Sequence, residues 1–202
     1  MSGTQTESAW DDSAVGVCDR RCAGPAARHS HHSGAANPSR RSGHVFLVDF
    51  GRTPSLVLTV GDNRMVAYAY GDWAYYALRK QGAIDSVAAL LWPTQGALGR
   101  KEMTGPATAD TIRRGIGAEI QQLYEFEVEQ QALERLQARL DSLHHDQAKT
   151  ATHSYGMTFV HHPEPYTYWS NSNHTTADWL KDLGCEIRGP AFSSWWRVRP
   201  RP

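Results

Sequence analysis

Ser172 is the side chain in this sequence best placed to act as a nucleophile. It lies in the run Asn171-Ser172-Asn173-His174, directly before apolar residues that recur at helical spacing. Ser and Asn are preferred at helix N-termini, because their side-chain oxygens accept hydrogen bonds from the unpaired N–H groups of the first turn. The run therefore predicts the start of a helix that ends at Gly184. Hydrolases also hold nucleophiles at the positive end of a helix, so capping and catalysis both remain open.

Asp72 and its aromatic neighbours form a second motif that could bind a ligand. The carboxylate of Asp72 could orient a histidine or bind a polar group, but it is also a preferred helix cap, and we favour the cap. Tyr168 belongs to a second group of aromatic residues, which precedes Ser172. If the two motifs meet in space, the aromatic rings would line a cleft suited to a sugar, a peptide or an acyl group. Burial in the core is the alternative for these rings.

The elements that must position these residues follow from hydrophobic spacing. Strand-like runs are expected at 44–50, 55–60, 65–70, 98–103, 119–128, 155–160 and 192–198. Helices are expected near 72–76, 84–92, 106–114, 133–145 and 172–183. The tight turns between the first three runs predict an antiparallel meander. Because strands and helices follow in no βαβ order, we predict an α+β fold in which helices pack against an antiparallel sheet.

Composition restricts the classes of partner. The 202 residues carry 21 Lys+Arg and 21 Asp+Glu, and this zero net charge argues against nucleic acid and anionic membrane surfaces as partners. No apolar run is long enough to cross a bilayer, and the N-terminus lacks the pattern of an export signal. Three cysteines are an odd number and indicate a reducing compartment rather than a disulfide framework. We therefore expect a cytoplasmic protein without a membrane span.

Residues 1–42 are expected to form a disordered tail before a single domain at 43–202. The tail is rich in Ser, Gly, Ala, Arg and His and has few large apolar residues that could offset the entropy of ordering. Its possible metal ligands are Cys18, Cys22, His29, His31 and His32. Their spacing matches no common zinc module, so we favour a histidine-rich tail and expect neither a metal nor a cofactor.

Four motifs resemble an uncharacterised bacterial domain family. They are V-F-L-V-D-F-G-R-T-P-S, Y-A-Y-G-D-W-A-Y-Y, L-L-W-P-T and N-S-N followed by A, W-L and L-G, and together they span roughly residues 44 to 199. The family is regarded as a distant relative of the circularly permuted papain-like peptidases and amidases. The resemblance implies a permuted papain-like core, with a histidine in the turn after the first strand and a cysteine at the start of the late helix.

Both catalytic positions implied by the resemblance are substituted. Ser172 stands at the position of the cysteine, and Thr53 stands at the position of the histidine. A helix end and an imidazole can ionise a thiol, whereas a serine needs a base within hydrogen-bond reach. His44, at the start of the first strand, lies where permuted papain-like enzymes also place their histidine. It could supply that base, with Asn173 or Asn171 supporting an oxyanion.

Two functions are therefore open. The first, which we favour, is a degenerate, non-catalytic papain-like domain that binds an unknown small molecule or peptide near Ser172. Its binding residues would be Thr53, Asp72, Asn171, His174 and Tyr168. The second is an amide or ester hydrolase with Ser172 as nucleophile and His44 as general base, supported by Asn173.

Overall fold

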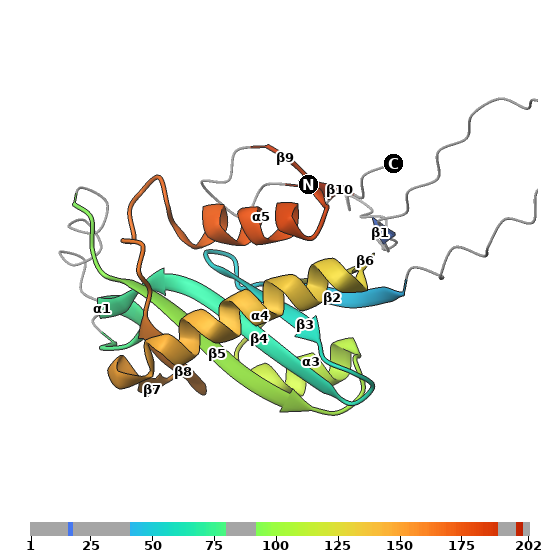
Figure 1. Cartoon of the computed structure of the whole chain (residues 1–202), viewed down its shortest axis with the longest axis horizontal. Helices are drawn as coiled ribbons and strands as arrows, with labels where there is room; N and C mark the ends of the chain where they lie inside the picture. The colour runs from blue at the N-terminus through green and yellow to red at the C-terminus, as the bar shows by residue number, and fades with distance from the viewer. Residues whose placement is uncertain (1–15, 18–40, 80–91, 190–196, 200–202) are drawn as a thin grey trace, which may run out of the picture.

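The computed structural model describes residues 16–17, 41–79, 92–189 and 197–199, and its centre is a twisted sheet covered by helices (Figure 1). The strands are β1 (Gly16–Val17), β2 (Ser42–Asp49), β3 (Pro54–Thr59), β4 (Arg64–Asp72), β5 (Gly96–Thr104), β6 (Gln122–Glu129), β7 (Thr152–Ser154), β8 (Met157–His161), β9 (Glu186–Arg188) and β10 (Arg197–Arg199). The helices are α1 (Trp73–Tyr76), α3 (Ala109–Ile116), α4 (Gln130–Asp146) and α5 (Ser172–Asp182), with a 3-10 turn η1 (Ala148–Thr150).

Seven strands pair antiparallel in the order β6-β2-β3-β4-β5-β8-β7, while β1 adds to β6 in parallel and β9 pairs with β10. This arrangement confirms the predicted α+β fold and the meander of β2, β3 and β4. The helix expected at 84–92 lies outside the described residues except for its last residue, Trp92. The expected tail at 1–42, apart from 16–17 and 41–42, and the expected strand at 192–198, apart from 197–198, also lie outside them.

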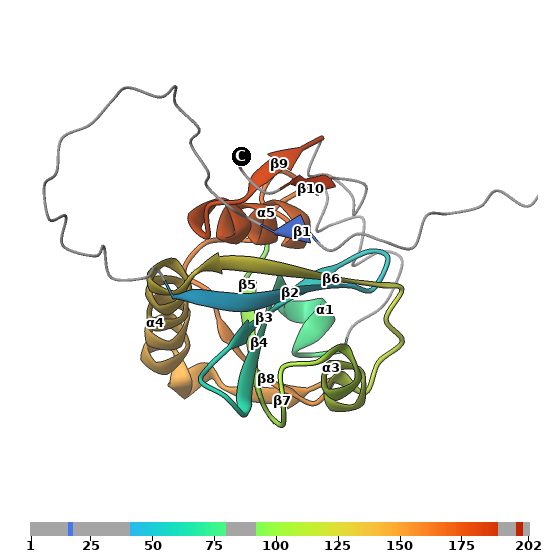
Figure 2. The ribbon, with the colours of Figure 1, turned by 90° about the vertical axis from the view of Figure 1, so that its right-hand side faces the viewer.

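Both faces of the sheet are buried. Successive residues of a strand point to opposite faces, and the central strands have apolar residues at successive positions. On β2, Val45 and Leu47 belong to a core shared with α4 and α5. Phe46 and Val48 point to the opposite face and belong to a second core, which includes Ile112 of α3. Figure 2 shows α4 and α3 on opposite sides of the strands. We call these the α5 face and the α3 face of the sheet.

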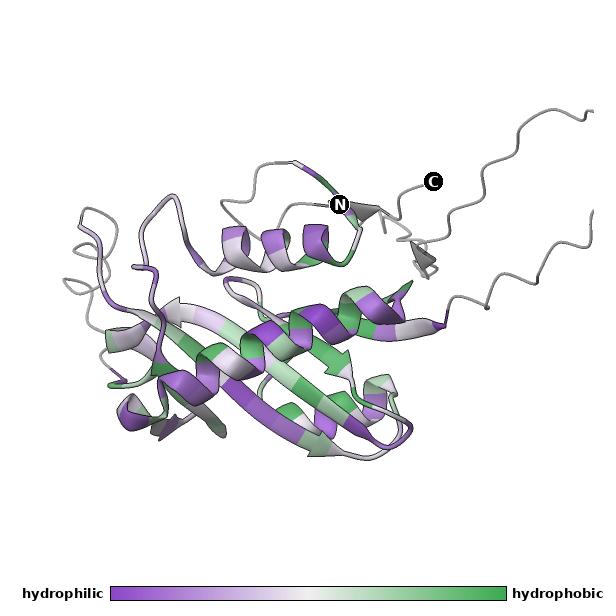
Figure 3. Cartoon of the chain, in the orientation of Figure 1, coloured by the Kyte–Doolittle hydropathy of each residue, from purple (hydrophilic) through white to green (hydrophobic). Residues whose placement is uncertain are grey.

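Helix α4 packs along the α5 face with the leucine stripe that its sequence predicts. Leu133, Leu136 and Leu140 are buried in the core, and Leu143 is half-buried against it. Charged residues occupy the other side of the helix, and Figure 3 shows hydrophilic segments along α4 and hydrophobic segments on the strands. None of the helices in the described ranges is long and apolar enough to cross a membrane.

A loop from β8 to α5 crosses the end of the sheet where β4 stops and β5 begins. Thr94 and Tyr166 pair in this crossing, since each main-chain N–H donates to the carbonyl oxygen of the other at 2.9 Å. The main-chain N–H of His162 also donates to the carbonyl oxygen of Gly96 at 2.8 Å. The loop is thus fixed to the sheet before it reaches Asn171 and the first turn of α5.

Candidate functional site

The first turn of α5 is capped by Asn171. Its side-chain oxygen Oδ1 accepts hydrogen bonds from the main-chain N–H of Asn173 at 3.0 Å and from that of His174 at 3.1 Å. The side-chain amide of Asn171 in turn donates to the carbonyl oxygen of Tyr168 at 3.2 Å. Asn171 therefore satisfies two of the free amides of the helix, and the capping interpretation of this run is confirmed.

Ser172 is the first residue of α5, and only 2% of its surface is exposed. The neighbouring His174 directs its ring nitrogen Nδ1 to Oδ1 of Asn171 at 3.0 Å. Burial lowers the pKa of His174 below its ordinary value, which favours a neutral ring. Within the described residues, no hydrogen bond joins the hydroxyl of Ser172 to a histidine, so the structure shows no activating base at this serine.

The structure does not bring His44 and Ser172 together. His44 shares the alternation of Phe46 and therefore points to the α3 face, where its Nδ1 lies 2.9 Å from a carboxylate oxygen of Glu125. Ser172 begins a helix on the α5 face. Asn173 of that helix contacts the turn after the far end of β2, and about 16 Å of strand separates His44 from that end.

His161, the last residue of β8, and His162, the first residue of the β8–α5 loop, contact other groups than Ser172. The ring of His161 meets Trp73 edge-on, with 4.3 Å between ring centroids. His162 is buried, and its ring meets Tyr70 edge-on at 4.9 Å. Its Nδ1 accepts the main-chain N–H of Glu164 at 3.1 Å, and burial lowers the pKa of its imidazole below the ordinary value. Both rings therefore hold the loop in place and do not act as a general base for Ser172.

Asn173 and Thr53 connect the start of α5 to the turn between β2 and β3. The side-chain amide of Asn173 donates to the carbonyl oxygen of Arg52 at 3.3 Å. The side chain of Thr53 forms a hydrogen bond with Tyr76 of α1, which partly offsets the rise in the Tyr76 pKa that burial causes. The position implied for the catalytic histidine is thus close to α5 in space, but it holds a threonine bonded to a phenol.

Asp72 caps α1, as its sequence predicts. Its Oδ1 accepts the main-chain N–H of Tyr75 at 2.8 Å, and its Oδ2 accepts the hydroxyl of Thr94. Burial first, and then the negative charge of Asp72, raise the pKa of Tyr166. Burial also raises the pKa of Tyr70 to about 12. Asp72 therefore lies in a partly buried cluster of hydroxyl groups, in which both of its carboxylate oxygens accept hydrogen bonds.

Sequence reasoning missed two members of this cluster, Tyr70 and Thr94. Alternation along β4 could have placed Tyr70 on the same face as Asp72, because the two are two residues apart. The hydroxyl of Tyr70 donates to the carbonyl oxygen of Pro165 at 3.1 Å. The pairing of Thr94 with Asp72 links segments 22 residues apart and has no local signal.

Tyr168 lies on the surface beside the cap. It is 42% exposed and meets Trp169 edge-on at 5.1 Å, and Trp169 itself is 71% exposed. These exposed rings differ from Tyr70, which is buried, and from Tyr76, which is half-buried. Some aromatic residues near the two motifs are therefore buried in the core, and others lie on the surface, where they could line a binding site.

Two buried polar atoms in the first turns of α5 have no hydrogen-bond partner within the described residues. They are Oδ1 of Asn173 and Oγ1 of Thr176. The side-chain amide of Asn173 cannot simply be reversed, because its Nδ2 already donates to the carbonyl of Arg52. An unpaired buried polar atom costs free energy, so a donor that reached either atom would be stabilising.

Replacing Thr176 with valine tests whether its hydroxyl is truly unpaired. The residue is fully buried, so removing an unsatisfied hydroxyl while keeping the branched shape should raise the free energy of unfolding by about 1 kcal/mol. Urea denaturation of wild type and Thr176→Val measures this difference. Thr176→Ser is the control, since it keeps the hydroxyl and loses the methyl group. A less stable valine variant would mean that the hydroxyl has a partner.

The described residues contain no group of three or more His, Cys, Asp or Glu side chains that could hold a metal ion. The tail cysteines and histidines lie outside the described residues, and Cys185 is buried. The chain matches none of the protein-family models, curated proteins or solved structures with which it was compared.

Proposed function

We propose that this chain is a degenerate, non-catalytic papain-like domain that binds a ligand or a partner through the region around Ser172. The observation that carries the proposal is that the side chain of Asn171 caps the first turn of α5. Asn171 accepts hydrogen bonds from two of its amides, Nδ1 of His174 is directed to the same side chain, and Nδ1 of His44 contacts Glu125. A serine that is buried at a capped helix end without a base is suited to structure rather than to nucleophilic attack.

Groups suited to binding surround this serine. Oδ1 of Asn173 is a buried acceptor without a described partner, and Tyr168 offers an exposed ring next to the cap. These groups favour a small molecule or a peptide with N–H donors and an apolar part. The zero net charge argues against nucleic acid, and the cysteine content favours the cytoplasm as the location.

Amide or ester hydrolysis by Ser172, with His44 as general base, is the alternative function of the same residues. It requires His44 to leave Glu125 and to reach the opposite face of the sheet. No contact among the described residues favours that rearrangement.

A fluorophosphonate probe distinguishes the two functions, because it labels only activated serines. We expect no labelling of the wild-type protein, while a competent serine hydrolase labels under the same conditions. Labelling that is lost in Ser172→Ala and in His44→Ala, but kept in Ser170→Ala, would overturn the proposal and establish a hydrolase. Circular dichroism of each variant checks that it remains folded.

Binding is tested by NMR titration with short N-acetylated peptide amides, which supply N–H donors. We expect saturable shifts of the side-chain amide of Asn173 and of the main-chain amides of 171–174. The shifts should be lost in Asn173→Ala and kept in Asn63→Ala, a matched change in the turn between β3 and β4. Shifts that do not saturate, or that persist without Asn173, would contradict the proposed binding region.

A further inference from the structure

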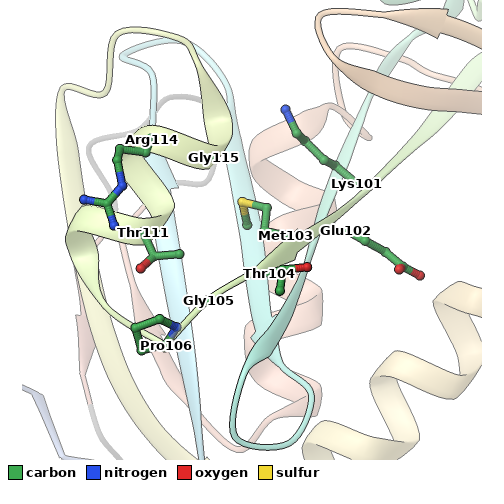
Figure 4. A pocket seen from close by; sticks show the side chains of 9 residues that line it. All are labelled: Lys101, Glu102, Met103, Thr104, Gly105, Pro106, Thr111, Arg114 and Gly115. Atoms are coloured by element: carbon green, nitrogen blue, oxygen red, sulfur yellow. The ribbon is translucent and has the colours of Figure 1, made fainter.

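The hollow between β5 and α3 has a volume of about 290 Å³, but its charged side chains do not converge (Figure 4). The amine of Lys101 lies beside Gly156 in the turn between β7 and β8, 2.9 Å from the place of an added Cβ atom. Figure 4 shows the guanidinium of Arg114 directed away from Lys101. The hollow therefore presents no defined group of charges to a ligand, whereas the edge of the sheet at β6 presents an ordered row of polar groups.

Strand β6 directs half of its main-chain groups away from the sheet. It lies between β2 and the two-residue strand β1 (Figure 2). The main-chain N–H of Gln130 donates to the carbonyl oxygen of Arg41 at 2.9 Å, in register with the ladder of β6 and β2. Because hydrogen-bonded and non-hydrogen-bonded pairs alternate in an antiparallel ladder, even-numbered residues of β6 bond to β2 and odd-numbered residues face outwards. The odd-numbered residues of β6 are Leu123, Glu125, Glu127 and Glu129.

Strand β1 shows how another segment can pair with this edge. It runs parallel to β6, with Gly16 opposite Phe126 and Val17 opposite Glu127. No other strand among the described residues pairs with this side of β6. The outward N–H and C=O groups of an edge strand are a template for an added strand. Because β1 pairs with only part of the edge, a longer extended segment could pair with all of it.

The side chains of β6 give this edge a negative charge on the α3 face. Glu125, Glu127 and Glu129 alternate with Phe126 and Val128, which are buried on the α5 face. One carboxylate oxygen of Glu125 lies 2.9 Å from a ring nitrogen of a histidine on β2, whereas Glu127 and Glu129 form no ion pair within the described residues. An antiparallel second copy of β6 would place glutamates opposite glutamates, which is unfavourable. The edge therefore favours a strand with basic side chains at alternate positions.

We propose that the outer edge of β6 binds an extended basic segment of a partner protein by parallel strand addition, and that β1 occupies part of this site in the unbound chain. Main-chain hydrogen bonds to the outward groups of β6 would supply affinity. Lysine or arginine side chains opposite Glu125, Glu127 and Glu129 would supply specificity. The proposal is independent of the function proposed for Ser172, because the two regions share no residue.

Fluorescence anisotropy with a labelled peptide, Val-Lys-Val-Lys-Val-Lys-Val amide, tests the proposal on the full-length protein. We expect saturable binding at physiological salt, and no binding of the same peptide with glutamate in place of lysine. In the register of β1, residues opposite Phe126 direct their N–H groups at β6, and residues opposite Glu127 direct theirs away. N-methylation of the valines should therefore abolish binding, whereas N-methylation of the lysines should be tolerated.

Three protein variants locate the binding edge. Glu127→Gln and Glu129→Gln should each weaken binding about two- to fivefold, as expected for one lost cross-strand charge pair. Glu102→Gln is the matched control, because Glu102 is an exposed glutamate on β5, which three strands separate from β6. Gly16→Pro should strengthen binding, since it removes a main-chain N–H that β1 directs at β6.

Several results would overturn this proposal. They are the absence of saturable binding, equal binding of the glutamate peptide or of the peptide with N-methylated valines, and full affinity in both glutamine variants of β6. An unchanged affinity in Gly16→Pro would show that β1 does not occupy the place of the peptide. Sedimentation equilibrium should give a monomer, and a dimer that the lysine peptide dissociates would identify a second copy as the occupant instead.

Discussion

Replacing Asp141 with alanine is expected to lower the free energy of unfolding by about 2–3 kcal/mol. Asp141 lies on α4, and one of its carboxylate oxygens accepts the hydroxyl of Tyr68 at 2.7 Å and Nε of Arg100 at 2.6 Å. Tyr68 is fully buried on β4, so alanine at 141 leaves its hydroxyl without this acceptor. The cost of an unpaired buried donor adds to the loss of two charge-assisted hydrogen bonds.

Urea denaturation followed by tryptophan fluorescence measures this change. Asp178→Ala is the matched control, because Asp178 on α5 lies 2.7 Å from the amine of Lys181 and both side chains are more than half exposed. That exposed pair is expected to contribute less than about 1 kcal/mol. Equal effects of the two substitutions would show that the buried phenol does not depend on Asp141.

The contribution of Asp141 should also depend on pH. Burial by itself raises the pKa of Asp141, but the hydrogen bonds from Tyr68 and Arg100 outweigh it, and the pKa is lowered below the ordinary value of 3.8. A lowered pKa in the folded state stabilises the fold above the unfolded-state pKa, and this contribution is lost as pH falls through the folded-state pKa. The stability difference between wild type and Asp141→Ala should therefore be constant above about pH 5 and narrow below about pH 4. A difference that grows towards acid pH would contradict this sign.

The sequence predicted those features of the fold that depend on neighbouring residues. Alternation of Tyr124, Phe126 and Val128 with glutamates predicted β6, where Phe126 and Val128 are buried. Asn171 and Asp72 were predicted to be caps, because a cap needs only its own side chain and the next turn of the helix. The period of two residues in a strand, the period of 3.6 residues in a helix and the preferences for capping residues can all be recognised from residues close together in the sequence.

Contacts between distant segments had no such local signal. Tyr68 and Asp141 are 73 residues apart, and Arg100 and Asp141 are 41 apart. The side of the sheet on which His44 lies could not be predicted either. Both faces of β2 are apolar, so the alternation of its residues does not indicate which face packs against α5. The alternative hypothesis that His44 pairs with Ser172 depends on that choice, whereas Asn171, Asn173 and His174 lie together because one helix turn holds them.

Replacing Gly96 with alanine is expected to destabilise the fold by about 3 kcal/mol and to disturb the start of α5, although the two sites are 76 positions apart. A Cβ atom at Gly96 would lie 2.4 Å from the main-chain oxygen of Glu164 and 3.0 Å from the hydroxyl of Tyr70. A main-chain atom cannot rotate away as a side chain can, so the loop that leads to Asn171 must shift. Overpacking of this kind costs about 1–3 kcal/mol, and the value should lie at the upper end because main chain is displaced.

Urea denaturation and the amide chemical shifts of 171–174 measure the two effects of Gly96→Ala. Gly61→Ala is the control, because Gly61 has a φ of +70° and no atom within 4 Å of an added Cβ. Its cost should be only the backbone strain of about 1 kcal/mol. If Gly96→Ala costs no more than this control and leaves the four amides unchanged, the crossing of the loop over β5 does not position the cap. If it costs more and moves them, the geometry around Ser172 depends on the absence of one methyl group on a distant strand.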